Sequence, residues 1–284
     1  MVLVALAGCS GAPIPGGGTG DRAPETATAT PAPVPDITPT ATRTVPPAQG
    51  PTVTADGDIA PGVTARGVVD AIALGTAHRA ALAERDLTVE RTVRVKYPNG
   101  TVVRLNETVA LSADRQRLHL VSTVGDRTVE RWAAGYDLTR EVNASEVRFE
   151  GTERRGGEHA LEAAYRRSFL SLLVAADDAR VTRVGPDGPA GADYRLTANT
   201  DTLRESGSPF GLDPDPGTVS LYVRADGLVV GWDLAYTARE LDGTPVAVRT
   251  EVRHLEVGTT TVERPAWFDA AVAATGLDAT ATPR

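Results

Sequence analysis

The fold is decided by the stretch LTVERTVRVKYPNGTVVRLNETVAL, residues 87–111. Apolar and polar residues alternate along both halves of this stretch, which is typical of strands with one buried face and one solvent-exposed face. Between the halves lies Asn99-Gly100, a pair that favours a tight hairpin because both residues tolerate positive φ. The stretch therefore predicts a β-hairpin, and its solvent-exposed face favours an antiparallel sheet over a buried parallel one.

The same alternation continues along the chain. Further short strands are expected at 116–124, 127–133, 145–150, 179–184 and 192–199. The last third is the clearest, with strands at 219–223, 228–236 and 246–252 separated by turns that contain Asp226-Gly227 and Asp242-Gly243. Leu255 and Val257 are out of phase with the strand before them, which predicts a bulge near Arg253-His254.

Helical periodicity replaces alternation in two stretches. A first helix is expected at about 67–84, with an apolar stripe formed by Val68, Ile72, Leu74 and Leu82. A second is expected over 158–176, where the apolar residues are Leu161, Ala164, Tyr165, Phe169, Leu172, Leu173 and Ala176. A short terminal helix begins near Pro265, since proline suits a first turn. Together these elements predict an α+β fold with an antiparallel sheet and two main helices.

Composition divides the chain into four segments. Residues 1–9 are expected to be the remnant of a lipoprotein signal, and residues 10–57, rich in Pro, Thr and Gly, a disordered stalk. Residues 58–275 are expected to form a single folded domain, followed by a flexible tail at 276–284. The stalk is either O-glycosylated on its threonines or a bare flexible linker.

The only cysteine, Cys9, ends a short apolar run that begins at Val2. Small residues before a cysteine fit a signal-peptidase pocket, and the thiol can carry a lipid. We therefore expect lipidation of Cys9 and a place on the extracellular face of the cell membrane; the alternative is an incidental thiol. Because the run lacks the basic segment of a complete signal, we also expect the true start to lie upstream. Stable anchoring needs two acyl chains or a second contact.

The chain is acidic and nearly free of lysine. Its net charge is −8, from 37 acidic and 29 basic residues, and Lys96 is the single lysine. This composition resembles the proteins of extreme halophiles, especially haloarchaea. A GC-rich genome would also replace lysine by arginine, but it would not explain the acidic excess. An acidic surface repels nucleic acid, which is therefore not expected as a partner.

The sequence offers no motif for catalysis, metal binding or cofactor binding. The histidines, His78, His119, His159 and His254, show no metal-ligand spacing, and no nucleophile elbow or glycine-rich phosphate loop occurs. Asp213 and Asp215 offer two carboxylates to calcium, but an acidic turn explains them as well. We therefore expect no catalytic residue, no metal and no cofactor, and a protein that is not an enzyme.

Three sequons make asparagines candidates for N-glycosylation in an exported protein. They are Asn99, Asn106 and Asn143. Asn99 is the best candidate because it lies at the expected hairpin tip.

Two sets of residues carry a resemblance to known families. The segment 223–229, the strand to Tyr236 and the segment 246–265 resemble the closing strands of the lipoprotein-carrier fold. That group includes bacterial LolA-like carriers and mycobacterial lipid-carrying lipoproteins. Pro61-Gly62-Val63 with Ala77-His78-Arg79 resembles uncharacterised haloarchaeal lipoproteins. The resemblance implies a LolA-like half-barrel, in which a strongly curved sheet wraps the two helices and leaves an apolar cavity.

The resemblance implies that the protein binds or carries a lipid or another apolar ligand. Candidate ligand-binding residues are Leu161, Tyr165, Phe169, Leu172, Trp232 and Tyr236. The same residues would be ordinary core if the sheet closes tightly on the helices. The alternative function is a non-catalytic structural or interaction protein of the cell envelope, with a solid core and an exposed apolar patch or sheet edge as its contact.

Overall fold

A computed structural model describes residues 57–153, 179–185, 188–189, 191–200, 213–240 and 242–277. All of them belong to one compact unit, Gln49–Arg284. The predictions for Cys9, for the stalk and for the helix at 158–176 lie outside these residues. Within the described ranges, no helix has the length and apolarity needed to cross a membrane.

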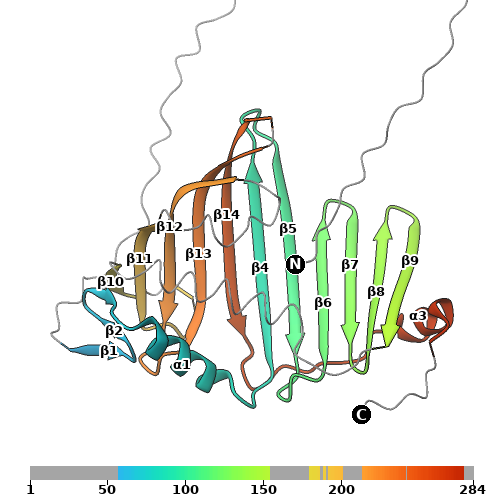
Figure 1. Cartoon of the computed structure of the whole chain (residues 1–284), viewed down its shortest axis with the longest axis horizontal. Coiled ribbons are helices and arrows are strands. Elements are labelled where there is room, and N and C mark those ends of the chain that lie inside the picture. The colour runs from blue at the N-terminus through green and yellow to red at the C-terminus, as the bar shows by residue number, and fades with distance from the viewer. Residues whose placement is uncertain are drawn as a thin grey trace, which may run out of the picture. The chain divides into compact units, whose positions relative to one another are not determined.

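One antiparallel sheet of eleven strands dominates the described structure (Figure 1). Its order is β10-β11-β12-β13-β14-β4-β5-β6-β7-β8-β9, so two meanders are joined where β14 pairs with β4. The first meander comprises β4 (Leu87–Lys96), β5 (Val102–Leu111), β6 (Leu118–Val124), β7 (Arg127–Ala133), β8 (Tyr136–Asn143) and β9 (Glu146–Glu153). The second comprises β10 (Arg180–Arg183), β11 (Tyr194–Thr200), β12 (Asp213–Val223), β13 (Val229–Arg239) and β14 (Pro245–Leu255).

The predicted antiparallel sheet is confirmed, together with two helices among the described residues, α1 (Ala71–Leu82) and α3 (Phe268–Thr275). The sheet is open, because β10 and β9 lie at opposite ends of the strand order. Its strong curvature into a half-barrel stays a prediction. All the strands expected from alternation are present, whereas β8 was not predicted.

The hairpin at 87–111 forms as predicted. β4 and β5 pair without interruption from Leu87↔Leu111 to Lys96↔Val102. At the tip, the Gly100 amide donates a hydrogen bond to the Tyr97 carbonyl at 3.0 Å, and Gly100 has φ +86°. Asn99 instead uses its side chain, whose Oδ1 accepts from the Thr101 amide at 2.9 Å. The left-handed conformation thus falls on the glycine alone.

The apolar side of the sheet changes between its two halves. We call face A the side that carries Val93 and Trp232, and face B the other side. From β10 to β5 the main core lies on face A, with fully buried residues such as Val93 and Leu221. Following the register through β5, β6 and β7 places Trp132 and Leu138 on face B. There α3 packs on them through Phe268, and so it covers the opposite side of the sheet.

A small sheet precedes α1. It consists of β1 (Asp58–Ala60), β2 (Val63–Thr64) and β3 (Gly67–Val68). The helix begins at Ala71 because Asp70 caps it, with Oδ1 accepting from the Ile72 and Ala73 amides at 3.0 and 2.9 Å. The predicted start near 67 and the predicted stripe are therefore partly wrong. Val68 belongs to β3, and Ile72 is 79% exposed, whereas Leu74 is fully buried.

Two further expectations about β12 and β14 are wrong. β14 pairs with β4 without a break through Arg253 and His254 to Leu255, and with β13 without a break up to Arg253, so no bulge lies there. Leu255 is out of phase because it lies on face B at the strand end, just before Glu256 takes φ +49°. The irregularities lie instead in the pairing of β12 with β13. Asp213 and Asp215 are part of β12 and not of a turn before it.

Candidate functional site

Two of the predicted ligand-binding residues, Trp232 and Tyr236, lie together on face A of β13. They are opposite Val252 and Val248 of β14 and are 5% and 8% exposed. Both belong to the main hydrophobic core. Leu161, Tyr165, Phe169 and Leu172 lie outside the described residues, so whether they approach this face stays a prediction.

An apolar strip continues face A on β5 beyond the fully buried side chains of β4. It consists of Val103, Leu105, Val109 and Leu111, which pack against the main core but are only partly buried. Val103 is opposite Val95, and Leu105 is opposite Val93. Between the two halves of the strip, Glu107 forms an ion pair with Arg91 of β4 at 3.9 Å. The strip thus offers accessible aliphatic surface with one charged pair at its middle.

Two buried histidines join α1 to the sheet. His78 of α1 and His254 of β14 have ring centroids 5.2 Å apart and share the backbone of Val229. The Val229 amide donates to His78 Nδ1 at 3.3 Å, while His254 Nδ1 donates to the Val229 carbonyl at 2.8 Å. Burial lowers the pKa of His78 to about 3, helped by the nearby His254, and lowers that of His254 to about 4. The pair is therefore neutral at physiological pH and has a structural role.

A polar cluster on face B secures the approach to α3. The indole nitrogen of Trp267 donates to Glu130 Oε2 at 2.7 Å, and Arg140 donates to Glu130 Oε1. His119 Nε2 lies 3.6 Å from the same carboxylate. Within the described ranges, no group of three or more His, Cys, Asp or Glu residues could hold a metal ion. Because Trp267 directly precedes α3, its hydrogen bond to Glu130 docks the start of that helix on β7.

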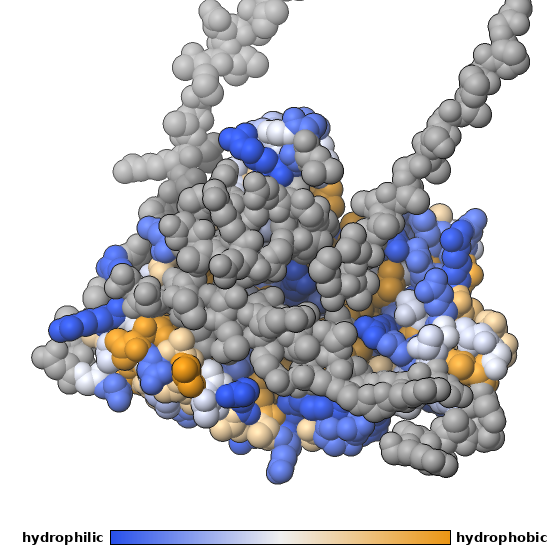
Figure 2. Space-filling view, viewed as in Figure 1, coloured by the Kyte–Doolittle hydropathy of each residue, from blue (hydrophilic) through white to orange (hydrophobic). Residues whose placement is uncertain are grey.

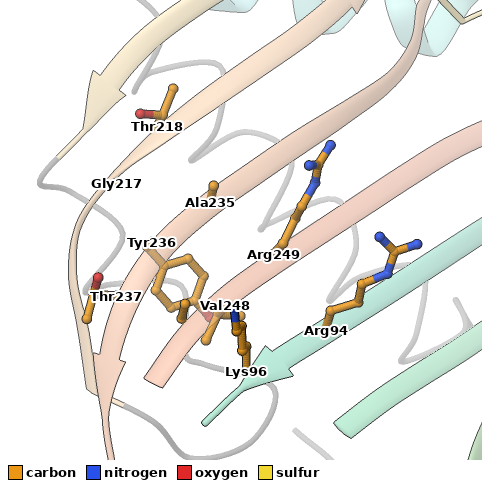
Figure 3. A pocket seen from close by; sticks show the side chains of 10 residues that line it. Arg94, Lys96, Gly217, Thr218, Ala235, Tyr236, Thr237, Val248 and Arg249 are labelled. Carbon is orange, nitrogen blue, oxygen red and sulfur yellow. The ribbon is translucent and has the colours of Figure 1, made fainter. Parts of the chain in front are cut away.

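A pocket of about 500 Å³ opens on the sheet near the ends of β4, β13 and β14 (Figure 3). Small residues form much of its lining, and Arg94, Lys96 and Arg249 contribute positive charge. The small lining residues are Gly217, Thr218, Ala235, Thr237 and Ala247. Figure 3 shows the side chains of Arg94 and Arg249 extending from neighbouring strands. The sequence alone did not reveal this pocket, because the strand register brings its residues together.

The three sequon asparagines are exposed. Asn99 lies at the tip of the first hairpin, Asn106 on β5 and Asn143 at the end of β8. Asn106 Oδ1 accepts a hydrogen bond from the Thr92 hydroxyl at 3.3 Å. Their glycosylation stays a prediction.

No protein-family model matches the chain, and no curated protein matches it. Among solved structures, it is similar to a DUF1329 family protein from Desulfovibrio piger, with 12% identity, coverage of 69% of this chain and 93% of that chain, and a TM-score of 0.26. It is also similar to a LolA superfamily protein from Nitrosomonas europaea, with 7% identity, coverage of 68% and 94%, and the same TM-score of 0.26. A LolA superfamily protein is thus among its structural neighbours. At this TM-score neither likeness carries an argument about function, which must rest on this chain's own residues.

Proposed function

We propose that this protein is a non-catalytic, lipid-anchored binding module of the cell surface that holds a lipid or another apolar ligand against face A of a LolA-like sheet. The observation that carries the proposal is the apolar strip of β5. Its four aliphatic side chains continue a buried apolar face but remain partly accessible. Ligand sites of this kind combine mostly apolar surface with a few polar groups that fix orientation.

Covering the strip with an acyl chain would remove apolar surface from water, which stabilises a complex by about 25 cal/mol per Å² before the costs of association. The Arg91–Glu107 pair lies on the same face, between Leu105 and Val109. The two charged side chains of this pair can interact with the polar head of a bound lipid and so fix its orientation. The strip therefore suits an amphiphile better than a purely aliphatic molecule.

The test is a titration with a fluorescent fatty-acid analogue, using Leu105→Gln and a matched control, Val102→Gln. Leu105 is on face A, whereas Val102, on the same strand, is on face B and 51% exposed. We expect the face A substitution to weaken binding about tenfold, which corresponds to the loss of about 1.4 kcal/mol, and the control to bind as the unchanged protein does. Equal affinity in all three, with unchanged circular dichroism, would contradict the use of face A.

The membrane anchor is a separate part of the proposal and is supported by the sequence at 2–9. Mass spectrometry of the protein extracted from membranes is expected to find two acyl chains linked to Cys9. A single acyl chain on Cys9 would mean that a second contact with the membrane completes the anchoring. A Cys9→Ser variant is expected to be released from the membrane fraction. An unmodified Cys9 thiol on the membrane-bound protein would contradict the proposed lipid anchor.

One observation favours the alternative function, an interaction protein of the envelope. Val69 and Ile72, at the start of α1, are 58% and 79% exposed, and hydrophobic surface is visible near α1 in Figure 2. If this patch binds a partner, Ile72→Ser will abolish a stable crosslinked product in intact cells and leave fatty-acid binding unchanged. If apolar ligand binding is the function, Ile72→Ser will change neither the crosslinking pattern in intact cells nor the fatty-acid binding.

A further inference from the structure

Three arginines lie directly opposite one another across three neighbouring strands. In the sheet register, Arg249 of β14 is opposite Arg94 of β4, and Arg94 is opposite Arg104 of β5. Directly opposite residues of an antiparallel pair point to the same face, with Cβ atoms about 5 Å apart. Lys96, the only lysine of the chain, follows Arg94 on that face. We call these four residues the cationic row; it lies on face B.

The row is only partly neutralised. Glu251 Oε1 lies 3.0 Å from Arg249 Nε and 3.8 Å from Arg94 Nη1. Within the described part of the chain, no other carboxylate forms an ion pair with these four cations. Arg94 Nε is shielded from solvent and lacks a hydrogen-bond partner among the described residues. The arrangement leaves an excess of positive charge on a protein whose net charge is −8.

Such an arrangement is unfavourable for the folded protein by itself. Like charges directly opposite each other in a sheet destabilise it, and this row contains two such pairs in succession. An anion placed between the guanidinium groups would reverse the sign of these interactions. The row is therefore better explained as a binding surface than as a stabilising feature.

The pocket beside the row has space for such an anion. Ala235 and Thr218 carry short side chains on face B (Figure 3). Ala247, on the same face, also lines the pocket, so little side-chain bulk surrounds the two arginines. Arginine presents a planar fork of donors that matches phosphate oxygens, and lysine adds a mobile point charge. Thr218 and Thr237 also line the pocket and supply hydroxyl groups.

We propose that the cationic row and its pocket bind the phosphate group of an anionic ligand, either a soluble phosphoester or a phospholipid headgroup. The site is on face B, so it is additional to the apolar ligand proposed for face A. Recognition is through Arg94 and Arg249, with Arg104 and Lys96 as flanking charges.

Calorimetric titration of the full chain with glycerol phosphate tests the phosphate contact. Arg94→Gln is compared with Arg148→Gln, which removes the same charge from β9, where Arg148 is 74% exposed and paired with Glu146. We expect at least about a tenfold loss of affinity for Arg94→Gln, because the variant loses a hydrogen bond between two charged groups. Arg148→Gln is expected to bind as the unchanged protein does.

The two sources of phosphate are separated by flotation with vesicles, carried out in a Cys9→Ser background so that no acyl chain on the protein contributes. Binding to phosphatidylglycerol vesicles but not to phosphatidylcholine vesicles, lost in Arg94→Gln, identifies a headgroup. Binding of glycerol phosphate without flotation identifies a soluble phosphoester.

Thermal unfolding provides a readout that a purely structural role would not give. Without phosphate, Arg94→Gln is expected to raise Tm because it relieves the repulsion, and it is expected to abolish the rise in Tm that phosphate causes. The proposal is overturned if neither glycerol phosphate nor anionic vesicles bind, or if Arg94→Gln and Arg148→Gln weaken binding equally. Fatty-acid binding is measured on the same samples, so failure of this site is distinguishable from failure of face A.

Discussion

At the scale of single residues, the contact of His78 and His254 with Val229 links α1 to β13 and β14. The backbone fixes both tautomers, because an amide can only donate and a carbonyl can only accept. The sequence showed only that these two histidines lack metal-ligand spacing. Both are buried, at 3% and 6% exposure. The register of β14 and the docking of α1 bring the two histidines together. A local sequence pattern cannot predict such a contact between distant segments.

This pair predicts a loss of stability in acid. An unfolded histidine titrates near its ordinary pKa of 6.5, whereas burial in the folded protein lowers the pKa of His78 to about 3 and that of His254 to about 4. Below pH 6.5 the unfolded chain binds more protons, so the free energy of unfolding falls as the pH drops toward 4. Each histidine contributes a slope of up to about 1.4 kcal/mol per pH unit.

Urea unfolding at several pH values between about 7.5 and about 4.5 measures this slope. The variant His254→Gln is expected to have a shallower slope than the unchanged protein. A His254→Gln variant with the full slope would show that other groups cause the acid sensitivity.

At the scale of elements, alternation was enough to predict most strands, since each has one apolar side. It did not show that this side changes between β6 and β7. Trp132 alternates with its neighbours just as Trp232 does, yet the two lie on opposite faces of one sheet. An alternating pattern indicates that one side of a strand is buried, but it does not indicate which face of the sheet that side belongs to. For β7 the face is set by the strand register and by α3, which covers Trp132. β8 was missed because its polar residues, such as Thr139 and Arg140, dilute a pattern that begins with Tyr136 and Leu138.

The element α1 depends on its N-cap. Asp70→Ala removes the acceptor for two amides, so we expect the free energy of unfolding to fall by about 1 kcal/mol. Asp58→Ala, which removes an exposed carboxylate from β1, is the matched control and should change it by less than about 0.5 kcal/mol. Equal effects of the two substitutions in urea unfolding would mean that the cap does not limit the stability of α1.

At the scale of the whole molecule, the net charge of −8 predicts that salt stabilises the protein. Raising KCl from about 0.1 M to about 1 M shortens the Debye length from about 10 Å to about 3 Å, which weakens repulsion among the acidic residues. We expect Tm to rise over this range, as it would for a halophilic protein. A series with an equal osmolality of sucrose separates screening from solute exclusion, and a falling Tm in KCl would contradict the prediction.

The candidate site was only partly predictable from sequence. Trp232 and Tyr236 were placed correctly on one face, because residues two and four apart on a strand share a side. Whether they line a cavity or form ordinary core depends on packing from distant elements, and in the described structure they are core. The apolar strip and the cationic row needed the register of β4, β5 and β14, which alternation alone does not specify.

The central claim is that the sheet holds an apolar ligand, and mass spectrometry of an organic extract of the purified protein tests it most directly. Protein released from the membrane as a Cys9→Ser variant is expected to yield an amphiphilic lipid in near-stoichiometric amount, and Leu105→Gln to yield much less. An extract free of apolar compounds from a folded Cys9→Ser protein that also fails to bind the fatty-acid analogue would contradict the claim.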